Sequence, residues 1–236
     1  MNYTQTFKPK NVIELIYKYG NDIVPGFYLN DIDVKVYDRV YRYFFKDQYF
    51  ESLQPSYRLN KGLLVLGNVG VGKSVMLQVF YDVLKHYNRL YSNIPKLKYF
   101  SSELDKATEH FQSFEIYKAN DLSGLYSKSG YEIIEQHTVK SYMRQNGINN
   151  KDYPLSICYD DLGAEEQYSS HYGCKVNVLK EILLKRYDLF MAKNMRTIIT
   201  TNLSSEQIQS YYGERVLSRL REMVNVVKYP GFDRRK

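Results

Sequence analysis

The chain has 236 residues, of which 44% are hydrophobic and 25% charged, and its net charge at pH 7 is +7. This composition is that of a folded protein with one good core, and its two cysteines are too few for a disulfide scaffold or a zinc cluster. We expect a cytoplasmic protein without membrane contact, because the sequence has no bilayer-length apolar run and its first ten residues lack a signal peptide's apolar core. The charge favours a polyanionic partner such as DNA or RNA, but a soluble basic protein without one would carry the same charge.

Residues 1–34 are predicted to form a short arm, with partner binding as one role open to it, and residues 35–236 to form the main domain. In the arm, apolar residues at helical spacing predict about one and a half turns of helix that Gly20 stops. Residues 31–50 predict a second helix, and residues 51–61 a polar connector. The apolar positions in the arm are Val12, Ile13, Leu15, Ile16 and Tyr19.

A Walker A pattern follows the strand-like run Gly62–Leu66 and precedes an amphipathic helical pattern. Its glycines let successive backbone N–H groups converge on phosphates, because a Cβ would block the approach. The next helix starts at about Lys73 and turns the positive end of its dipole to the phosphates. We expect Lys73 to reach the β- and γ-phosphates of ATP and the Ser74 hydroxyl to bind Mg²⁺. The predicted nucleotide-binding residues are Gly67, Asn68, Val69, Gly70, Val71, Gly72, Lys73, Ser74 and Val75.

Four further runs predict buried strands, with helical patterns between them. Alternating strands and helices predict an α/β fold with a five-stranded parallel sheet flanked by helices. Ligands of such sheets bind at the carboxyl ends of the strands, so polar residues directly after each run are candidate site residues. The runs are Phe114–Ala119, Leu155–Asp160, Arg196–Thr201 and Val224–Tyr229, and the clearest later helix spans residues 178–191.

Residues 123–151 mix cations with tyrosines, which suits single-stranded nucleic acid. A solvated helical face explains the same pattern equally well. The residues concerned are Lys128, Lys140, Arg144 and Lys151 among Tyr126, Tyr131 and Tyr142.

Two adjacent acids, Asp160 and Asp161, end the third predicted strand and are typical of a Walker B element. We expect Asp160 to hold the Mg²⁺ shell and Asp161 to orient the attacking water. The alternative is that both acids cap the next segment. Asn202 ends the fourth predicted strand, where an amide can hold the water or a γ-phosphate oxygen, although Asn there is also an ordinary turn residue.

Arg215 and Arg219 lie four residues apart on a predicted helix and therefore share a face. Arginine stabilises transferring phosphoryl charge, often from a neighbouring subunit. A basic helix face on a basic protein is the alternative.

In this order, the motifs resemble the AAA+ ATPases of the DnaC/DnaI helicase-loader and IstB transposition-helper family. The segments that carry the resemblance are residues 62–74, 157–165, 197–203, 212–220 and 231–235. The resemblance covers roughly residues 35–236 and implies an AAA+ (ASCE-type) P-loop domain without a separate C-terminal lid domain. It also implies ATP-dependent homo-oligomers, binding of single-stranded DNA, and action on a replicative helicase or a transposition complex.

The resemblance assigns roles to single residues. Asn202 is similar to sensor 1, Arg219 to the arginine finger with Arg215 in support, and Arg235, in preference to Arg234, to sensor 2. The family usually has Glu where this chain has Asp161, which implies weak hydrolysis or a switch-like role. Glu165 lies beyond the strand end and is a poorer substitute.

A helicase loader is thus the first functional hypothesis, and an IstB-like helper of a transposase on duplex DNA is the second. A P-loop kinase for a small molecule is a third, but it leaves Arg215 and Arg219 without a role. A nucleotide-gated binding module with negligible turnover is the fourth, which Asp161 keeps open.

Overall fold

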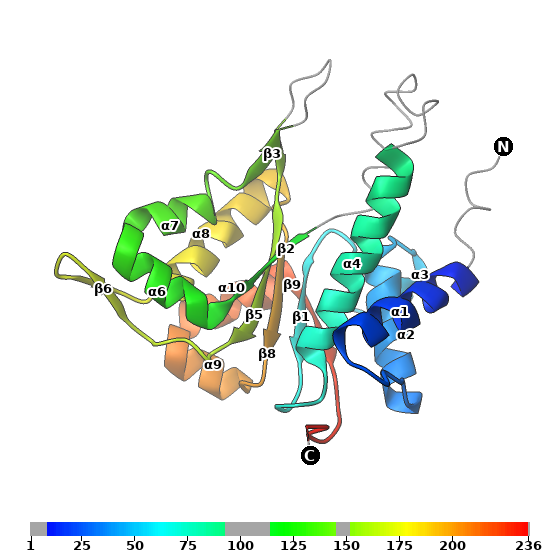
Figure 1. Cartoon of the computed structure of the whole chain (residues 1–236). Coiled ribbons are helices and arrows are strands. Elements are labelled where there is room, and N and C mark those ends of the chain that lie inside the picture. The colour runs from blue at the N-terminus through cyan, green and yellow to red at the C-terminus, as the bar shows by residue number, and fades with distance from the viewer. Residues whose placement is uncertain (1–8, 93–113, 145–151, 236) are drawn as a thin grey trace.

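The computed structural model describes residues 9–92, 114–144 and 152–235 (Figure 1). Its centre is a five-stranded parallel sheet in the order β2-β5-β8-β1-β9. All five strands coincide with predicted ones, which confirms the predicted α/β fold. β8 lies between β1 and β5. Because these strands are parallel, the Walker A loop and both acids lie at the same side of the sheet, where the strands have their carboxyl ends. The strands are β1 (Gly62–Leu66), β2 (Phe114–Lys118), β5 (Ser156–Leu162), β8 (Thr197–Thr201) and β9 (Val224–Lys228).

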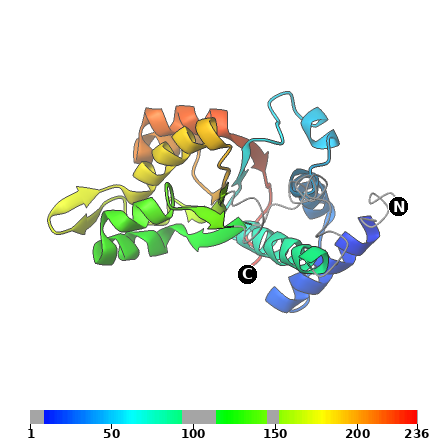
Figure 2. The ribbon, with the colours of Figure 1, turned by 90° about the horizontal axis from the view of Figure 1, so that it is seen from above.

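Helices cover both faces of the sheet (Figures 1 and 2). One face carries α1, α2 and α4, and the other carries the helices from α6 to α10. β1 serves both layers, because Leu63 and Val65 point to the first and Leu64 to the second. The helices are α1 (Pro9–Ile23), α2 (Asp31–Phe44), α3 (Tyr49–Ser52), α4 (Lys73–Ser92), α6 (Ala119–Ser129), α7 (Tyr131–Gln136), α8 (Val178–Lys193), α9 (Ser205–Tyr212) and α10 (Glu214–Met223).

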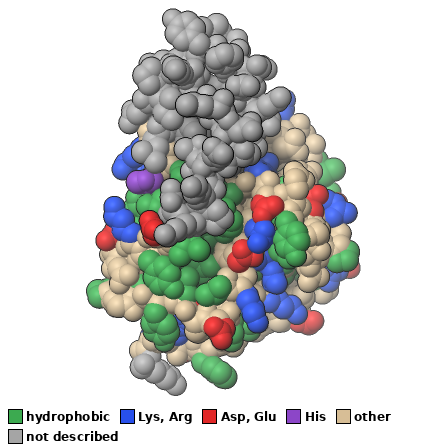
Figure 3. All heavy atoms as spheres, turned by 90° about the vertical axis from the view of Figure 1, so that its right-hand side faces the viewer, with side chains coloured by type: hydrophobic (Ala, Val, Ile, Leu, Met, Phe, Trp, Pro, Cys, Tyr) green, Lys and Arg blue, Asp and Glu red, His purple; other side chains and the backbone are tan. Residues whose placement is uncertain are grey.

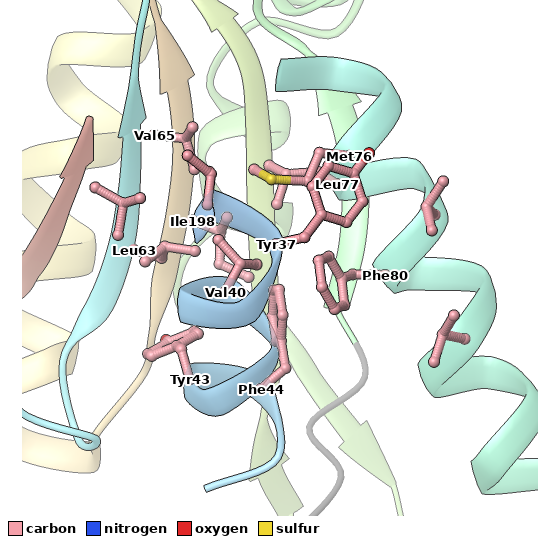
Figure 4. Packing of buried hydrophobic residues seen from close by; sticks show 14 of the residues in the cluster. Tyr37, Val40, Tyr43, Phe44, Leu63, Val65, Met76, Leu77, Phe80 and Ile198 are labelled. Carbon is pink, nitrogen blue, oxygen red and sulfur yellow. The ribbon is translucent and has the colours of Figure 1, made fainter. Parts of the chain in front are cut away.

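Aromatic side chains join α2 and α4 to the sheet in the first layer. Phe44 of α2 stacks on Phe114 of β2 with ring centroids 5.1 Å apart and meets Phe80 of α4 at 5.5 Å. Tyr37 contacts the same Phe80 ring from one face of α2 (Figure 4). Each such pair contributes about 0.5–1.5 kcal/mol to stability beyond the contribution of the apolar area that it buries. This packing fixes α4, and with it the Walker A loop at its start.

The N-terminal helix is longer than predicted. α1 continues through Gly20 to Ile23 and packs on α4. A Cβ at position 20 would collide with the Phe27 ring, so this glycine allows a close approach within the helix and does not end it. The predicted helix over residues 31–50 is also divided, since α2 ends at Phe44 and α3 follows Lys46, whose φ is 54°.

Two antiparallel hairpins were not predicted. They are formed by β3 (Tyr142–Arg144) with β4 (Asp152–Pro154), and by β6 (Ser169–His171) with β7 (Cys174–Val176). The β6–β7 hairpin projects from the body of the molecule (Figures 1 and 2). Strands of three residues are too short to show a period-two pattern.

Arg186 of α8 is fully buried at the amino ends of the strands, on the side of the sheet opposite the two acids. Its guanidinium donates to the carbonyl oxygens of His137, Leu155 and Arg196 at 2.8, 3.1 and 2.6 Å, and to Thr197 Oγ1 at 2.9 Å. It therefore ties α8 to the starts of two strands.

We expect Arg186→Met to lower the free energy of unfolding by about 3 kcal/mol or more, because buried carbonyl oxygens lose their donors. Urea unfolding followed by circular dichroism measures this loss. Lys193→Met at the exposed end of the same helix is the control, with an expected effect under about 0.5 kcal/mol. Equal effects of the two substitutions would contradict the role given to Arg186.

Candidate nucleotide-binding site

The Walker A loop joins β1 to α4, and Lys73 is the first residue of that helix. Gly70 and Gly72 have φ of 77° and 103°, a region that favours glycine and that occurs in the backbone turns that form phosphate nests. The Lys73 ammonium donates to the carbonyl oxygens of Gly67 and Asn68 at 2.8 and 2.9 Å. The loop is therefore folded around its own lysine in a form that can receive phosphates.

Burial lowers the pKa of Lys73, and the charge of Arg235 acts in the same direction. Asp161 and Asp160 oppose both effects. The two acids therefore lie close enough to the loop lysine for their charges to act on it.

Asp160 meets the Walker A loop directly. The Ser74 hydroxyl donates to Asp160 Oδ1 at 2.9 Å across 86 positions of sequence. Hydroxyl and carboxylate oxygens are ligands that Mg²⁺ accepts, and Mg²⁺ beside a nucleotide keeps waters and needs only one or two protein ligands. The described residues hold no group of three or more His, Cys, Asp or Glu side chains that could bind a metal alone. The Ser74–Asp160 pair therefore fits Mg²⁺ bound together with a triphosphate.

Asp161 adopts a left-handed backbone conformation with φ of 60°, and its side chain is exposed. Asn202 directly follows β8 and is also exposed. Since β8 lies between β1 and β5, Asn202 follows the strand between the Walker A loop and the acids. The carboxyl ends of these strands gather the predicted residues at one edge.

Glu165 has a structural role instead of facing this edge. Its carboxylate is buried, accepts from Gly163 N at 2.8 Å and is hydrogen-bonded by Tyr212 OH. Burial raises the pKa of Glu165 despite these hydrogen bonds. Glu165 joins the loop after β5 to α9, so its carboxylate is engaged away from the nucleotide position.

The C-terminal segment (residues 230–235) lies across the Walker A loop. Arg234 N donates to Gly70 O at 3.1 Å, and Asn68 Nδ2 donates to Gly231 O at 3.3 Å. A Cβ at position 70 would collide with Asp233, so this glycine is needed for the segment as well as for the loop's turn.

The two arginines of this segment point to different partners. Arg234 forms an ion pair with Asp33 of α2, whereas the exposed Arg235 contacts only its neighbour Asp233, at 3.2 Å, among the described residues. The charge of Arg235 is also the one that acts on Lys73. Of the two arginines, it is therefore Arg235 whose charge acts on the Walker A lysine, whereas Arg234 is paired with Asp33.

Asp33 was missed by sequence reasoning. It is fully buried, closes the capping box of α2 with Asn30, and accepts from Tyr229 OH at 2.7 Å as well as from Arg234. Burial acts to raise the pKa of Asp33, but these hydrogen bonds outweigh it and hold the pKa below its ordinary value. The Asn-x-x-Asp spacing signals the cap, but nothing local signals the contact with Arg234.

Arg215 and Arg219 lie on α10, in the second helical layer. Arg219 stacks over the Tyr187 ring at 4.7 Å and lies 3.6 Å from Asp188, whereas Arg215 is exposed. Both line a shallow surface depression with Glu214 and Ser218. Among the described residues, neither arginine contacts the Walker A loop of its own chain.

Of the aromatic and basic residues predicted over 123–151, those that the structure describes are not all exposed. Tyr126 is buried in the core, Lys140 pairs with Glu135 at 2.6 Å, and the Lys185 ammonium lies over the Tyr131 ring at 5.4 Å. Lys128 is exposed. Lys151 lies outside the described residues, and the side chains of Tyr142 and Arg144 are not among those that the structure describes.

The β6–β7 hairpin instead presents aromatic rings to solvent. Tyr172 at its turn is 97% exposed, and Tyr168 is half exposed with the Lys175 ammonium 5.1 Å from its ring. His171 Nδ1 lies 3.0 Å from Ser127 O, which fixes the hairpin to α6. Sequence reasoning did not find this cluster, because the tyrosine bias of the whole chain hides it.

Comparison with solved structures identifies the fold. The DnaC helicase loader superposes with a TM-score of 0.50 at 18% identity, over 90% of this chain and 98% of that chain. The chain has the fold of the DnaC helicase loader. DnaI (TM-score 0.48, 18% identity, 94% and 93% covered) and a proposed primosome component from Streptococcus pyogenes serotype M3 (0.49, 19%, 87% and 84%) are also similar.

No protein-family model and no curated protein matches the sequence. The DnaC-like fold agrees with the resemblance drawn from the motifs, which is confirmed at the level of fold. Among the described residues, no helix is both long enough and apolar enough to cross a membrane.

Proposed function

We propose that the chain is a Mg²⁺-dependent ATPase of helicase-loader type. The observation that carries this proposal is the Ser74–Asp160 hydrogen bond of 2.9 Å, which brings the Walker A and Walker B elements together. Lys73 and the loop N–H groups bind the phosphates, Asp161 orients the attacking water, and Asn202 and Arg235 complete the pocket. Ser74 and Asp160 would hold Mg²⁺, which would supply positive charge to offset the negative charge of the phosphates.

In this proposal, ATP drives assembly of a cytoplasmic homo-oligomer in which Arg219, supported by Arg215, acts on the neighbouring nucleotide. Residues 35–236 form the ATPase domain and residues 1–34 the arm. The arm has exposed apolar side chains, among them Ile13, Val24 and Tyr28. Figure 3 shows hydrophobic side chains next to charged ones on one face of the molecule. An apolar surface of this kind suits a protein partner, here a replicative helicase.

Size-exclusion chromatography with light scattering, with and without ATP and Mg²⁺, tests assembly. We expect a larger species with ATP and a turnover per subunit that rises with protein concentration. Turnover that is independent of concentration, from a species that stays monomeric, would remove the arginine finger from the proposal. Pull-down with an Asp161→Asn variant and ATP then identifies the partner as a helicase or a transposase.

Single-stranded DNA binding is supported by the net charge of +7 and by the exposed rings of the β6–β7 hairpin. Stacking of one base is worth about 1–3 kcal/mol, so we expect Tyr172→Ala to weaken oligo-dT binding by about 5- to 100-fold. Fluorescence anisotropy across a salt series measures this change.

Tyr49→Ala is the matched control, because Tyr49 is also exposed and has a cation, Arg42, 4.7 Å from its ring, but lies on α3. Equal losses in the two variants would show that the hairpin is not the contact. Preference of the wild-type protein for duplex DNA would favour the IstB-like alternative.

A further inference from the structure

We propose that Thr200 is a positioning residue for ATP hydrolysis: its hydroxyl holds Asp160 against Ser74 and fixes the backbone turn that presents Asp161. This inference rests on the proposed ATPase function and adds a residue to that site. Thr200 lies in the middle of the sheet on β8, two residues before Asn202, and is fully buried.

The pairing of β5 with β8 is interrupted opposite Thr200. Tyr159 pairs with Ile199 and Leu162 pairs with Thr201, so Asp160 and Asp161 together face a single residue. This is a β-bulge, which leaves one residue outside the ladder and bends the strand. Bulges next to active sites re-aim side chains, and this one separates the directions of two adjacent acids.

The Thr200 hydroxyl bonds to both residues of the bulge. Its Oγ1 donates to Asp160 Oδ1 at 2.6 Å and accepts from Asp161 N at 2.7 Å. Because the bulge takes the Asp161 N–H out of the strand ladder, this hydroxyl supplies the acceptor that the N–H needs. Left-handed conformation in a residue other than glycine costs about 1 kcal/mol or more, so the φ of 60° at Asp161 depends on such support.

The same hydroxyl fixes the carboxylate that faces the metal position. Asp160 Oδ1 accepts from Thr200 on one side and from Ser74 on the other, at 2.9 Å. The carboxylate is thereby oriented before Mg²⁺ arrives, while Asp161 stays exposed for water. Asn202, by contrast, makes no hydrogen bond to either acid within the described ranges.

Thr200→Val removes the hydroxyl and keeps the shape, and Thr200→Ser keeps the hydroxyl. Hydrogen bonds to charged groups contribute about 1.5–3 kcal/mol, so we expect Thr200→Val to weaken the Mg²⁺-dependent part of nucleotide binding by about 10- to 100-fold. Isothermal titration with ADP at several Mg²⁺ concentrations measures it. In EDTA, we expect the nucleotide affinity of Thr200→Val to differ from wild type by less than about twofold. We also expect kcat to fall in Thr200→Val, and Thr200→Ser to keep Mg²⁺-dependent binding and kcat near wild type.

Thr201→Val is the matched control. Thr201 is the adjacent buried threonine, and its hydroxyl also makes two hydrogen bonds, to Leu162 O at 2.7 Å and from Leu203 N at 3.1 Å, but neither to an acid. We expect this variant to lose stability without any change in Mg²⁺ dependence. If Thr200→Val fails to fold, Thr200→Ala, which places no methyl against Asp160, replaces it.

A Thr200→Val or Thr200→Ala variant with wild-type Mg²⁺ dependence and kcat would overturn the inference and leave the ATPase proposal standing. Loss of Mg²⁺ dependence in Thr201→Val to the same extent would also overturn it, since a merely structural role would then suffice. If wild-type protein shows no Mg²⁺-dependent nucleotide binding, the proposed function itself fails.

Discussion

Lys73→Ala lowers the affinity for ATP and ADP by about 100-fold or more, because in the proposed site the Lys73 ammonium bonds to phosphate oxygens and a hydrogen bond to a charged group contributes about 1.5–3 kcal/mol. Loss of its attraction to several phosphate oxygens adds to that value. Among the described residues, the hydrogen bonds of Lys73 go to two loop carbonyl oxygens at 2.8 and 2.9 Å, which water can replace. The effect therefore falls on binding and not on folding. Isothermal titration with circular dichroism as a folding check measures both.

Lys85→Ala is the control for this experiment. Lys85 lies on the exposed side of the same helix, with its ammonium 5.3 Å from the Tyr81 ring. We expect nucleotide affinity within about twofold of wild type and a stability change under about 0.5 kcal/mol. Tight ATP binding by Lys73→Ala would remove the nucleotide site from residues 67–75.

Arg219→Ala lowers ATP turnover by about 100-fold or more while ATP binding stays near wild type, because an arginine supplied across an interface stabilises transition-state charge. Within one chain the Arg219 guanidinium is held over Tyr187 and 3.6 Å from Asp188, so it must leave these contacts to act on a neighbour. Phosphate release measured against protein concentration follows the reaction.

Mixing two inactive variants tests whether the arginine acts in trans. Arg219→Ala retains the acids, and Asp161→Asn retains the arginine, so hybrid interfaces combine one intact half of each and recover part of the turnover. Arg221→Ala is the control, as Arg221 is exposed on the same helix two positions away. Failure of the mixture to recover turnover would contradict action in trans. Full activity of Arg219→Ala alone would transfer the role to Arg215, which is exposed in the single chain.

The sheet and the loop could be predicted because their signals are local. Each buried strand is an apolar run bounded by turn residues, and the Walker A glycines are contiguous. The carboxyl ends of parallel strands and the resemblance to AAA+ proteins predict that Asp160 lies near Ser74, and the hydrogen bond between them agrees with this. The assignments of Asn202, Arg215, Arg219 and Arg235 to roles stay predictions.

The parts that could not be predicted depend on distant contacts. Gly20 was interpreted as a helix stop, but its lack of a side chain instead leaves room for the Phe27 ring to pack against the helix. Tyr126 was grouped with exposed cations although it packs in the core, because the neighbouring residues in the sequence do not show whether a tyrosine is buried. Thr200 was missed because a bulge is visible only when two strands are aligned.

The contact between Asp33 and Arg234 joins residues 201 positions apart, and Arg234 in turn bonds to the Walker A loop through Gly70. This contact therefore requires both α2 and the C-terminal segment to be in place. A fragment that holds the loop but lacks the first helices would lose this ion pair and keep only the hydrogen bonds between residues 230–235 and the loop. Truncation that removes α2 would therefore loosen the segment that carries Arg235, although α2 contributes no residue to the proposed nucleotide site.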